Sequence, residues 1–387
     1  MADSIISRGQ GIASADPDPS VYLQIGIVQK ALLGLLSLPK VSHCVGQDYR
    51  NYVQKGSDSI LGKLLNASQD TSYPLDRLSL GRGLLMEYID SDHNQTVDAA
   101  LDALNESIEL QKRNQYGGLW YFTYPNWSYL DGMFSYTSFA SLYTSFFNPS
   151  DTKNTTDRII YQLDLLWSHC RDNATGLLFH GYDASKSASW ADPVTGASPV
   201  VWGRALGWYF MALVDWLEMN TFQTQSLQWA QVHSRFVALA DAIVEAADPA
   251  SGAWWQVLNF SGREGNYIES SGSSMFVYGL YKGVRLGYLS SAAERHRETA
   301  NRAYEYLVDT FVVKNDNGTL GWNGTVSVCS LNSPATYEVF FSMSFGNVGL
   351  VANENDQYYV TQPLLFNSVH GSASFVLASL ENEMQAI

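Results

Sequence analysis

The sequence has few positive charges and no long apolar run. Lysine and arginine together number 23 against 38 aspartates and glutamates, which gives a formal net charge of -15 at pH 7. A surface with this charge repels the phosphates of nucleic acid, so we exclude a nucleic-acid partner. No run of about 18 apolar residues occurs, so we expect nothing that spans a membrane.

Cysteines are also scarce. Cys44, Cys170 and Cys329 fit neither a disulfide framework nor a metal site, and at least one of the three must stay unpaired within the chain. Aromatic residues, in contrast, are abundant (11 Trp, 23 Tyr and 17 Phe). They exceed what a core of this size needs, and stacking on sugars is a common use for such a surplus.

N-glycosylation sequons are unusually frequent. Eight asparagines head an Asn-x-Ser/Thr triplet: Asn66, Asn94, Asn105, Asn154, Asn173, Asn259, Asn317 and Asn323. Asn126 makes a ninth, but its aromatic surroundings argue against a glycan. The density favours a secreted eukaryotic protein, although the N-terminus from Met1 to Ser4 is no signal peptide. We expect an extracellular protein whose signal was removed, with a cytoplasmic location as the alternative.

Apolar residues recur at helical spacing along most of the chain, whereas alternating β-branched runs are scarce. We therefore predict a mainly helical protein with little sheet. The helical patterns begin at Tyr22 and recur near 48–66, 75–90, 96–113, 133–147, 155–171, 199–219, 225–247, 271–288, 292–313 and 370–384. Residues 1–20 are small and polar, and we predict an irregular lead-in there, followed by a single catalytic domain over 21–387.

A weak repeat organises these helices. Glycine turns at Gly117, Gly176, Gly252 and Gly318 each follow an Asn- or Asp-containing segment and each precede a new helical pattern. Units of this length hold two helices and a loop, so the chain has room for about six helical hairpins. This predicts an all-α (α/α)6 barrel with its functional loops gathered at one end. The alternative is that the four glycine turns recur by coincidence.

Two aspartates lie where helices are expected to begin. Asp131 follows an aromatic segment that contains Trp120, Tyr121 and Trp127. Aromatic surroundings remove water from a carboxyl group and favour its neutral, proton-donating form. Asp76 comes shortly after Pro74 at another predicted helix start. For both aspartates the alternative is a simple helix N-cap.

Three further residues could bind an acidic sugar. His180 lies beside a glycine in a loop, and Trp202 and Arg204 occupy the first turn of a predicted helix. A cation in that turn opposes the helix dipole, so Arg204 needs another reason to be there. A guanidinium beside an indole suits a sugar carboxylate, while pairing with a structural carboxylate is the alternative. The polar segment 269–274 could bind sugar hydroxyls or act as a serine-rich helix cap.

Taken together, these segments resemble the unsaturated uronyl hydrolases, which are glycoside hydrolase family 105 and the related family 88. The similarity covers roughly residues 20–384 and includes Tyr337-Glu338 near its end. The motifs that carry it are Leu75-Asp76, the Gly-Gly-Leu-Trp turn at 117–120, the segments 129–133, 180–183, 190–193, 202–209 and 273–278.

The resemblance implies an (α/α)6 barrel with a pocket at one end, and we expect the enzyme to need no metal and no cofactor. It also implies removal of a 4,5-unsaturated uronic acid from the non-reducing end of lyase-generated oligosaccharides. Asp131 matches the general acid/base of the family and Asp76 its second acidic residue. His180, Trp202 and Arg204 match positions that bind the unsaturated sugar, and we expect a monomer with further substrate contacts from Trp120, Tyr121 and Trp127.

One departure from the family pattern concerns the substrate. Members that act on rhamnogalacturonan fragments often carry a basic pair after the Gly-Gly-x-Trp turn, where this sequence has Tyr121-Phe122. An unsaturated glucuronyl end is therefore at least as plausible as a galacturonyl end. We expect Asp131 to donate the proton and Asp76 to stay ionised beside it. The alternatives are an inverting glycosidase with Asp76 and Asp131 as its acid/base pair, and a sugar-binding protein without turnover.

Overall fold

The computed structural model describes residues 1–387 except 16, 92–93, 222–223, 333–357 and 386–387, so the Tyr337-Glu338 motif lies outside the described residues. An inner ring consists of α2 (Val21–Leu35), η1 (Leu75–Leu80) running into α5 (Gly81–Asp90), α7 (Gly132–Phe147), α9 (Gly203–Met219), α11 (Ser270–Arg285) and α15 (Val369–Met384). The outer helices are α1 (Ala2–Ser7), α3 (His43–Leu61), α6 (Gln95–Leu110), α8 (Thr152–Cys170), α10 (Leu227–Glu245) and α12 (Ala293–Phe311).

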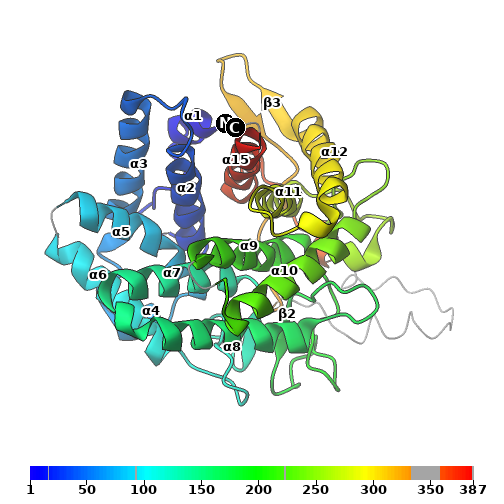
Figure 1. Cartoon of the computed structure of the whole chain (residues 1–387), viewed down its shortest axis with the longest axis horizontal. Helices are drawn as coiled ribbons and strands as arrows, with labels where there is room; N and C mark the ends of the chain where they lie inside the picture. The colour runs from blue at the N-terminus through cyan, green and yellow to red at the C-terminus, as the bar shows by residue number, and fades with distance from the viewer. Residues whose placement is uncertain (16, 92–93, 222–223, 333–357, 386–387) are drawn as a thin grey trace.

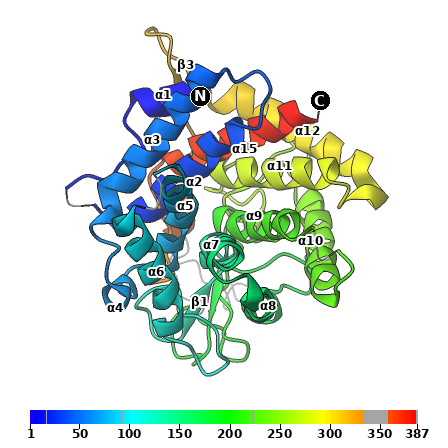
Figure 2. The ribbon, with the colours of Figure 1, turned by 60° about the vertical axis from the view of Figure 1, so that its left-hand side comes forward.

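The inner helices pack against one another in chain order, and α15 closes the ring by packing against α2. Figure 1 shows this closure, with the red α15 beside the blue N-terminal helices. The outer helices surround the ring (Figure 2), and α3, α6, α8, α10 and α12 each pack against the preceding inner helix. This arrangement confirms the predicted (α/α)6 barrel.

The inner and outer helices differ in how much of their surface is apolar. Every residue of α9 from Gly203 to Leu217 is buried, because neighbours cover the helix on all sides. The outer helix α12 buries only one stripe, which includes Ala300, Ala303, Leu307 and Phe311. This spacing of three to four residues is the one from which the helices were predicted.

The N-terminal segment corrects one prediction. Residues 2–7 form the helix α1, which packs against α15, instead of an irregular lead-in. Ala2 and Ile5 belong to the hydrophobic core, so two apolar residues were enough to anchor a short helix. The segment after α1 then leads to Pro19 and Ser20, which become part of a cavity wall described below.

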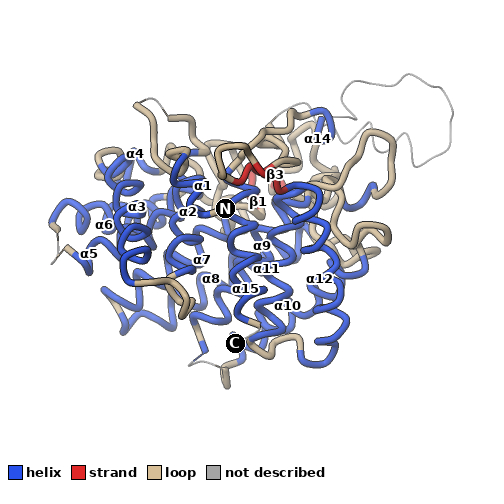
Figure 3. Tube along the Cα trace, turned by 90° about the horizontal axis from the view of Figure 1, so that it is seen from above, coloured by secondary structure: helices blue, strands red, loops and turns tan. Residues whose placement is uncertain are grey.

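The predicted glycine turns are confirmed as a structural repeat. The four glycines all adopt a positive φ, between 74° and 80°, which favours glycine because it has no Cβ. Each amide donates to the carbonyl of the Asn or Asp residue that starts the turn: Gly117 to Asn114, Gly176 to Asp172, Gly252 to Asp248 and Gly318 to Asn315. Each turn follows an outer helix and precedes the next inner helix, so the four loops gather at one end of the barrel, as Figure 3 shows.

Sheet content is low, as predicted. β1 (Trp127–Tyr129) pairs antiparallel with β2 (Gly181–Asp183), and β3 (Val312–Lys314) with β4 (Leu320–Trp322). The short elements η2 (Pro149–Asp151), η4 (Leu258–Phe260), η5 (Ser290–Ala292), α4 (Ala67–Asp70) and α14 (Tyr358–Thr361) lie in connections. All three cysteines are free thiols. Among the described helices, none combines the length and apolar character needed to cross a bilayer.

Candidate active site

A cavity of about 160 Å³ lies at the loop end of the barrel. Six of the eight predicted site residues line it: Asp76, Tyr121, Asp131, His180, Trp202 and Arg204. The sequence-based prediction therefore brings together residues that lie far apart along the chain. The remaining lining residues are Pro19, Ser20, Leu23, Pro74, Phe122, Tyr124, Tyr129, Trp208, Val328, Cys329, Ser330 and His370.

The barrel presents helix N-termini to this cavity. Ser20 immediately precedes α2, Asp131 precedes α7, and Trp202 precedes α9, while His370 is the second residue of α15. Backbone amides at a helix N-terminus carry a partial positive charge and favour a nearby anion. Four such ends around one cavity create a site suited to a negatively charged ligand.

Asp131 occupies the N-cap position of α7, but its side chain does not cap the helix. Its Oδ2 atom lies 3.2 Å from Nε2 of His180, without the alignment of a hydrogen bond. The other ring nitrogen of His180, Nδ1, is 2.8 Å from the hydroxyl of Tyr359. The capping interpretation is therefore wrong, and the Asp131 carboxyl points into the cavity beside an anchored imidazole.

Asp76 is buried, with only 3% of its surface exposed, and accepts a hydrogen bond of 2.8 Å from the Tyr121 hydroxyl. Burial raises the pKa of Asp76 to about 7, and the negative charge of Asp131 adds to this rise. The hydrogen bond from Tyr121 and the positive charge of Arg77 act in the opposite direction and lower the pKa. We expected Asp76 to stay ionised, whereas its burial shifts its pKa toward neutrality and favours the protonated form.

Arg204 lies with its guanidinium 4.7 Å from the ring of Trp202, as the sequence suggested. Its two terminal nitrogens, however, donate to the backbone carbonyls of Val326 and Ser327. A carboxylate oxygen of Glu269 also lies 3.9 Å away, so the structural partner that we considered is present as well. Arg204 thus brings a positive charge to the cavity, while the protein itself occupies much of its hydrogen-bonding fork.

The predicted aromatic contacts are only partly placed in the cavity. Trp202 lines it, and its Nε1 donates to Gln256. Trp120 and Trp127 are absent from the lining, so we no longer assign them to substrate contact. Trp120 packs under the ammonium group of Lys112, and Trp127 packs edge-on against Trp190.

The polar segment 269–274 is a helix cap, the alternative that we considered for it. The Glu269 side chain accepts from the Gly272 amide at the start of α11 and from the hydroxyl of Ser271. Ser271 in turn lies 3.2 Å from the Arg204 guanidinium. The segment therefore contacts Arg204 through Ser271 and Glu269 and does not line the cavity.

Sequence analysis missed His370, which comes from the apolar helix α15. It is 6% exposed, and neither of its ring nitrogens has a partner among the described residues. Burial, with a smaller contribution from the Arg204 charge, lowers the pKa of His370 to about 3, so the imidazole is neutral. Asp76 Oδ1 is also buried without a hydrogen bond within the described chain. Unpaired buried polar atoms around one cavity indicate a site built for a polar ligand or water.

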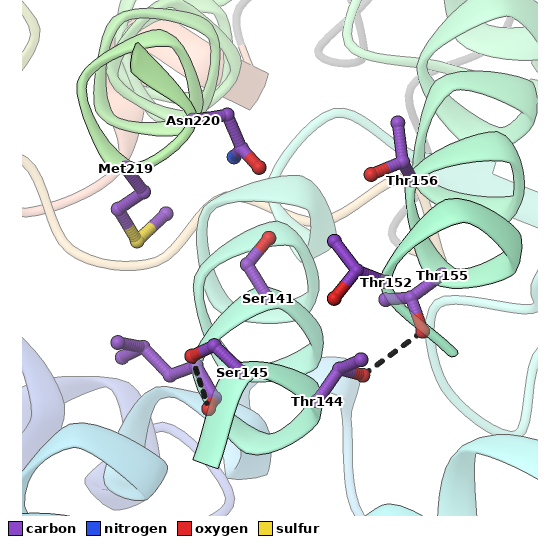
Figure 4. Close-up of a pocket in the computed structure, with 9 residues that line it drawn as sticks. Ser141, Thr144, Ser145, Thr152, Thr155, Thr156, Met219 and Asn220 are labelled. Carbon is purple, nitrogen blue, oxygen red and sulfur yellow. Dashed lines mark hydrogen bonds between the residues drawn. The ribbon is translucent and has the colours of Figure 1, made fainter. Parts of the chain in front are cut away.

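Two other cavities lie at the opposite end of the barrel. One, of about 120 Å³, is lined mainly by hydroxyl groups between the ends of α7, α8 and α9, with Thr144 bonded to Thr155 (Figure 4). It contains no titratable side chain and so offers no acid or base. The other, of about 260 Å³, contains charges that are paired with one another, such as Asp215 with Lys30 and Lys282. Nowhere in the described chain do three metal-ligating side chains cluster.

Comparison with known proteins identifies relatives that are glycoside hydrolases. A glycoside hydrolase from family 105 of C. acetobutylicum, whose structure is solved, is 28% identical and superposes with a TM-score of 0.79. The match covers 99% of this chain and 98% of that chain. An unsaturated glucuronyl hydrolase from Bacillus sp. GL1 shares the fold at 13% identity, with a TM-score of 0.65 and coverage of 99% and 94%.

A curated relative, Protein Atu3128 of Agrobacterium fabrum, is 33% identical over 215 residues, which are 55% of this chain and 85% of that protein. The family model described as Glycosyl Hydrolase Family 88 matches residues 34–386, which is most of the sequence. The chain therefore belongs to Glycosyl Hydrolase Family 88 and is a glycosidase.

Proposed function

We propose that this glycosidase removes a 4,5-unsaturated uronic acid, glucuronyl or galacturonyl, from the non-reducing end of lyase-generated oligosaccharides. The observation that carries the proposal is the pair of buried carboxyls, Asp76 and Asp131, in an aromatic-walled cavity beside Arg204. Hydration of an alkene requires a carboxyl group that can donate a proton to carbon.

The cavity also offers a way for an acidic protein to bind an acidic sugar. The whole chain carries a net charge of -15, which repels anions at long range. Within the cavity, Arg204 and the N-terminal ends of α2, α7, α9 and α15 supply positive charge locally. Arg204 is the sole lysine or arginine among the described lining residues, which suits a ligand with a single carboxylate.

The chemistry follows from the structure of the substrate. In an unsaturated uronide the C4=C5 bond is conjugated to the carboxylate and joined to the ring oxygen, so it is an enol ether. Protonation of C4 forms a new C–H bond and leaves an oxocarbenium ion centred on C5. Water adds to C5 and gives up a proton, and the resulting hemiketal opens and expels the aglycone from C1. One group must donate a proton to carbon and recover one from water.

We assign the proton transfer to Asp131 and the positioning of that carboxyl to Asp76. Asp131 lies beside His180, which the Tyr359 hydroxyl holds in place. An inverting glycosidase would instead need Asp76 and Asp131 to flank C1 and would leave the alkene intact.

The test is loss of the enol-ether ultraviolet absorbance with a panel of lyase products, for the wild type and Asp131→Asn. Asparagine is isosteric but cannot donate a proton to carbon, so we expect kcat to fall by about 10²–10⁴-fold, with little change in binding. Asp70→Asn is the matched control, because Asp70 is buried outside the cavity. Near-wild-type turnover in Asp131→Asn would remove Asp131 from the mechanism.

The alternatives give different results in the same assay. Hydrolysis of saturated uronides with no loss of absorbance from the unsaturated ones would favour the inverting glycosidase. Binding of the unsaturated sugars without turnover by the wild type would favour a sugar-binding protein.

A further inference from the structure

Asp76 depends on a single hydrogen-bond donor. Within the described chain, the Tyr121 hydroxyl is the one group that donates to its carboxyl, at 2.8 Å, and the second oxygen is buried without a partner. The adjacent Arg77 does not help, because its guanidinium is bound to Ser107, to Gln111 and to backbone carbonyls. The orientation of the carboxyl therefore rests on Tyr121.

Tyr121 is itself held tightly. Its ring stacks on Tyr129 with centroids 4.8 Å apart, and its carbonyl accepts from the amide of Leu75, the residue before Asp76. Its own amide donates to the carbonyl of Trp127 in β1. These backbone hydrogen bonds and the ring contact fix the position of the Tyr121 hydroxyl relative to the Asp76 carboxyl.

Gly132 allows Leu75 and Tyr121 to pack close to the start of α7, where the second carboxyl, Asp131, lies. A Cβ atom at position 132 would lie 2.7 Å from a methyl group of Leu75 and 3.4 Å from the Tyr121 ring. Glycine at the first position of α7 therefore lets the helix start pack directly on Leu75 and Tyr121. This packing brings Asp131, the residue before Gly132, and Asp76 into the same cavity.

We propose that Tyr121 is a positioning residue that orients the Asp76 carboxyl and favours its ionised form, and that it does not act chiefly by stacking on the sugar. Its hydroxyl points at the carboxyl and its ring face is covered by Tyr129, so much of its surface is already committed to the protein. The kinetic part of this inference rests on the proposed function, whereas the ionisation of Asp76 does not.

The physical basis is that a donor to a carboxylate stabilises the charged form, whereas burial and a second carboxyl oppose it. Removal of the Tyr121 hydroxyl leaves those opposing effects unbalanced. The titratable groups that face Asp76 or share its cavity are Tyr121, Tyr124, Tyr129, Asp131, His180, Arg204, Cys329 and His370, together with Arg77 on the same element. Of these, only Tyr121 donates to the Asp76 side chain within the described residues.

The first test needs no substrate. Protein labelled with ¹³C at the aspartate carboxyl is titrated by NMR, and the Asp76 signal is assigned by its loss in Asp76→Asn. We expect Tyr121→Phe to raise the Asp76 midpoint by about one pH unit, the effect of losing a hydrogen bond to a charged group. Tyr209→Phe is the matched control, because it removes a buried tyrosine bond to the Leu163 carbonyl outside the cavity. An unmoved Asp76 midpoint in Tyr121→Phe would overturn the inference.

The second test is a double-mutant cycle on the pH–rate profile. The limb that reports Asp76 should move to higher pH in Tyr121→Phe, and the same substitution should have no further effect in an Asp76→Asn background. A loss that is equal at every pH, or one that persists in that background, would mean that Tyr121 acts directly on the sugar. If the wild type consumes no unsaturated uronide, the proposed function fails while the NMR titration still decides the role of Tyr121.

Discussion

Asp76 should reduce the stability of the fold in a way that depends on pH. Burial raises the pKa of its carboxyl to about 7, whereas an aspartate in the unfolded chain titrates near 4. Between these values the folded protein binds a proton that the unfolded chain has released, so stability falls as pH rises. Below about pH 4 the penalty is absent, and above about pH 7 it is complete.

Asp76→Asn removes this titration and should therefore stabilise the protein increasingly between pH 5 and pH 8. Two pH units of this window correspond to about 2.7 kcal/mol in the free energy of unfolding. Replacing the carboxyl by an amide also changes the free energy of unfolding by an amount that does not depend on pH. This constant drops out when the stability difference between Asp76→Asn and the wild type is compared at pH 5 and at pH 8. Catalysis should be lost in the same variant, since Asp76 belongs to the carboxyl pair.

The measurement is urea unfolding of the wild type and Asp76→Asn at pH 5 and pH 8. Asp70→Asn is the control, because burial also raises the pKa of Asp70, to about 6, although Asp70 does not line the cavity. It should gain about 1.4 kcal/mol over the same interval and keep its activity. If the stability difference between Asp76→Asn and the wild type is the same at both pH values, the Asp76 carboxyl does not titrate as we argue.

Two further predictions concern the sugar site and the surface. Arg204→Lys should raise KM roughly tenfold, and more than it lowers kcat, because lysine keeps the charge but loses the planar guanidinium beside Trp202 that suits a sugar carboxylate; an unchanged KM would show that Arg204 is purely structural. We also propose that the protein is exported, and expect mass spectrometry after secretory expression to find glycans on the exposed sequons and not on Asn259, whose side chain is bonded to the backbone of Val201 and Pro199. The exposed sequons are Asn66, Asn94, Asn154, Asn173, Asn317 and Asn323, and a glycan at Asn259 would contradict the assignment.

Local patterns in the sequence were sufficient to predict the barrel. Helical spacing of apolar residues located the long helices to within a few residues, because an inner or outer helix must bury at least one stripe. The glycine turns were recognisable because a positive φ after Asn or Asp strongly favours glycine. Their position between outer and inner helices then placed the loops at one end. The short helix α1 was missed because its anchor on α15 is far away in the sequence.

The candidate site could be predicted only in part, for two physical reasons. Tyr121 lines the cavity together with Phe122 while the adjacent Trp120 packs against Lys112, and no local pattern in the sequence distinguishes these three aromatic residues. His370 carries no local signal, because it occupies an apolar helix and faces the cavity only when α15 closes the ring. Residues at predicted helix starts, such as Asp76, Asp131 and Arg204, were found, whereas His370, which ring closure supplies, was not.

Asp76 and Asp215 show why the ionisation of a carboxyl could not be predicted from the sequence. Both are buried, at 3% and 4% exposure, and burial alone would raise the pKa of either one. At Asp215 this effect is overcome by Lys282 and Lys30, whose ammonium groups lie 2.7 Å and 2.9 Å away and lower its pKa.

Asp76 has a neutral tyrosine hydroxyl in place of these cations, and its pKa rises. The two ends of the barrel differ accordingly. Near the end of α9, Lys30 and Lys282 neutralise the buried Asp215 carboxylate, and lysines and arginines face the negative helix termini. Where the inner helices begin, the carboxyl pair has Arg204 as its one cationic neighbour in the described cavity lining. Asp76 can therefore retain a proton where Asp215 cannot, which supports the acid/base chemistry that we propose for the loop end.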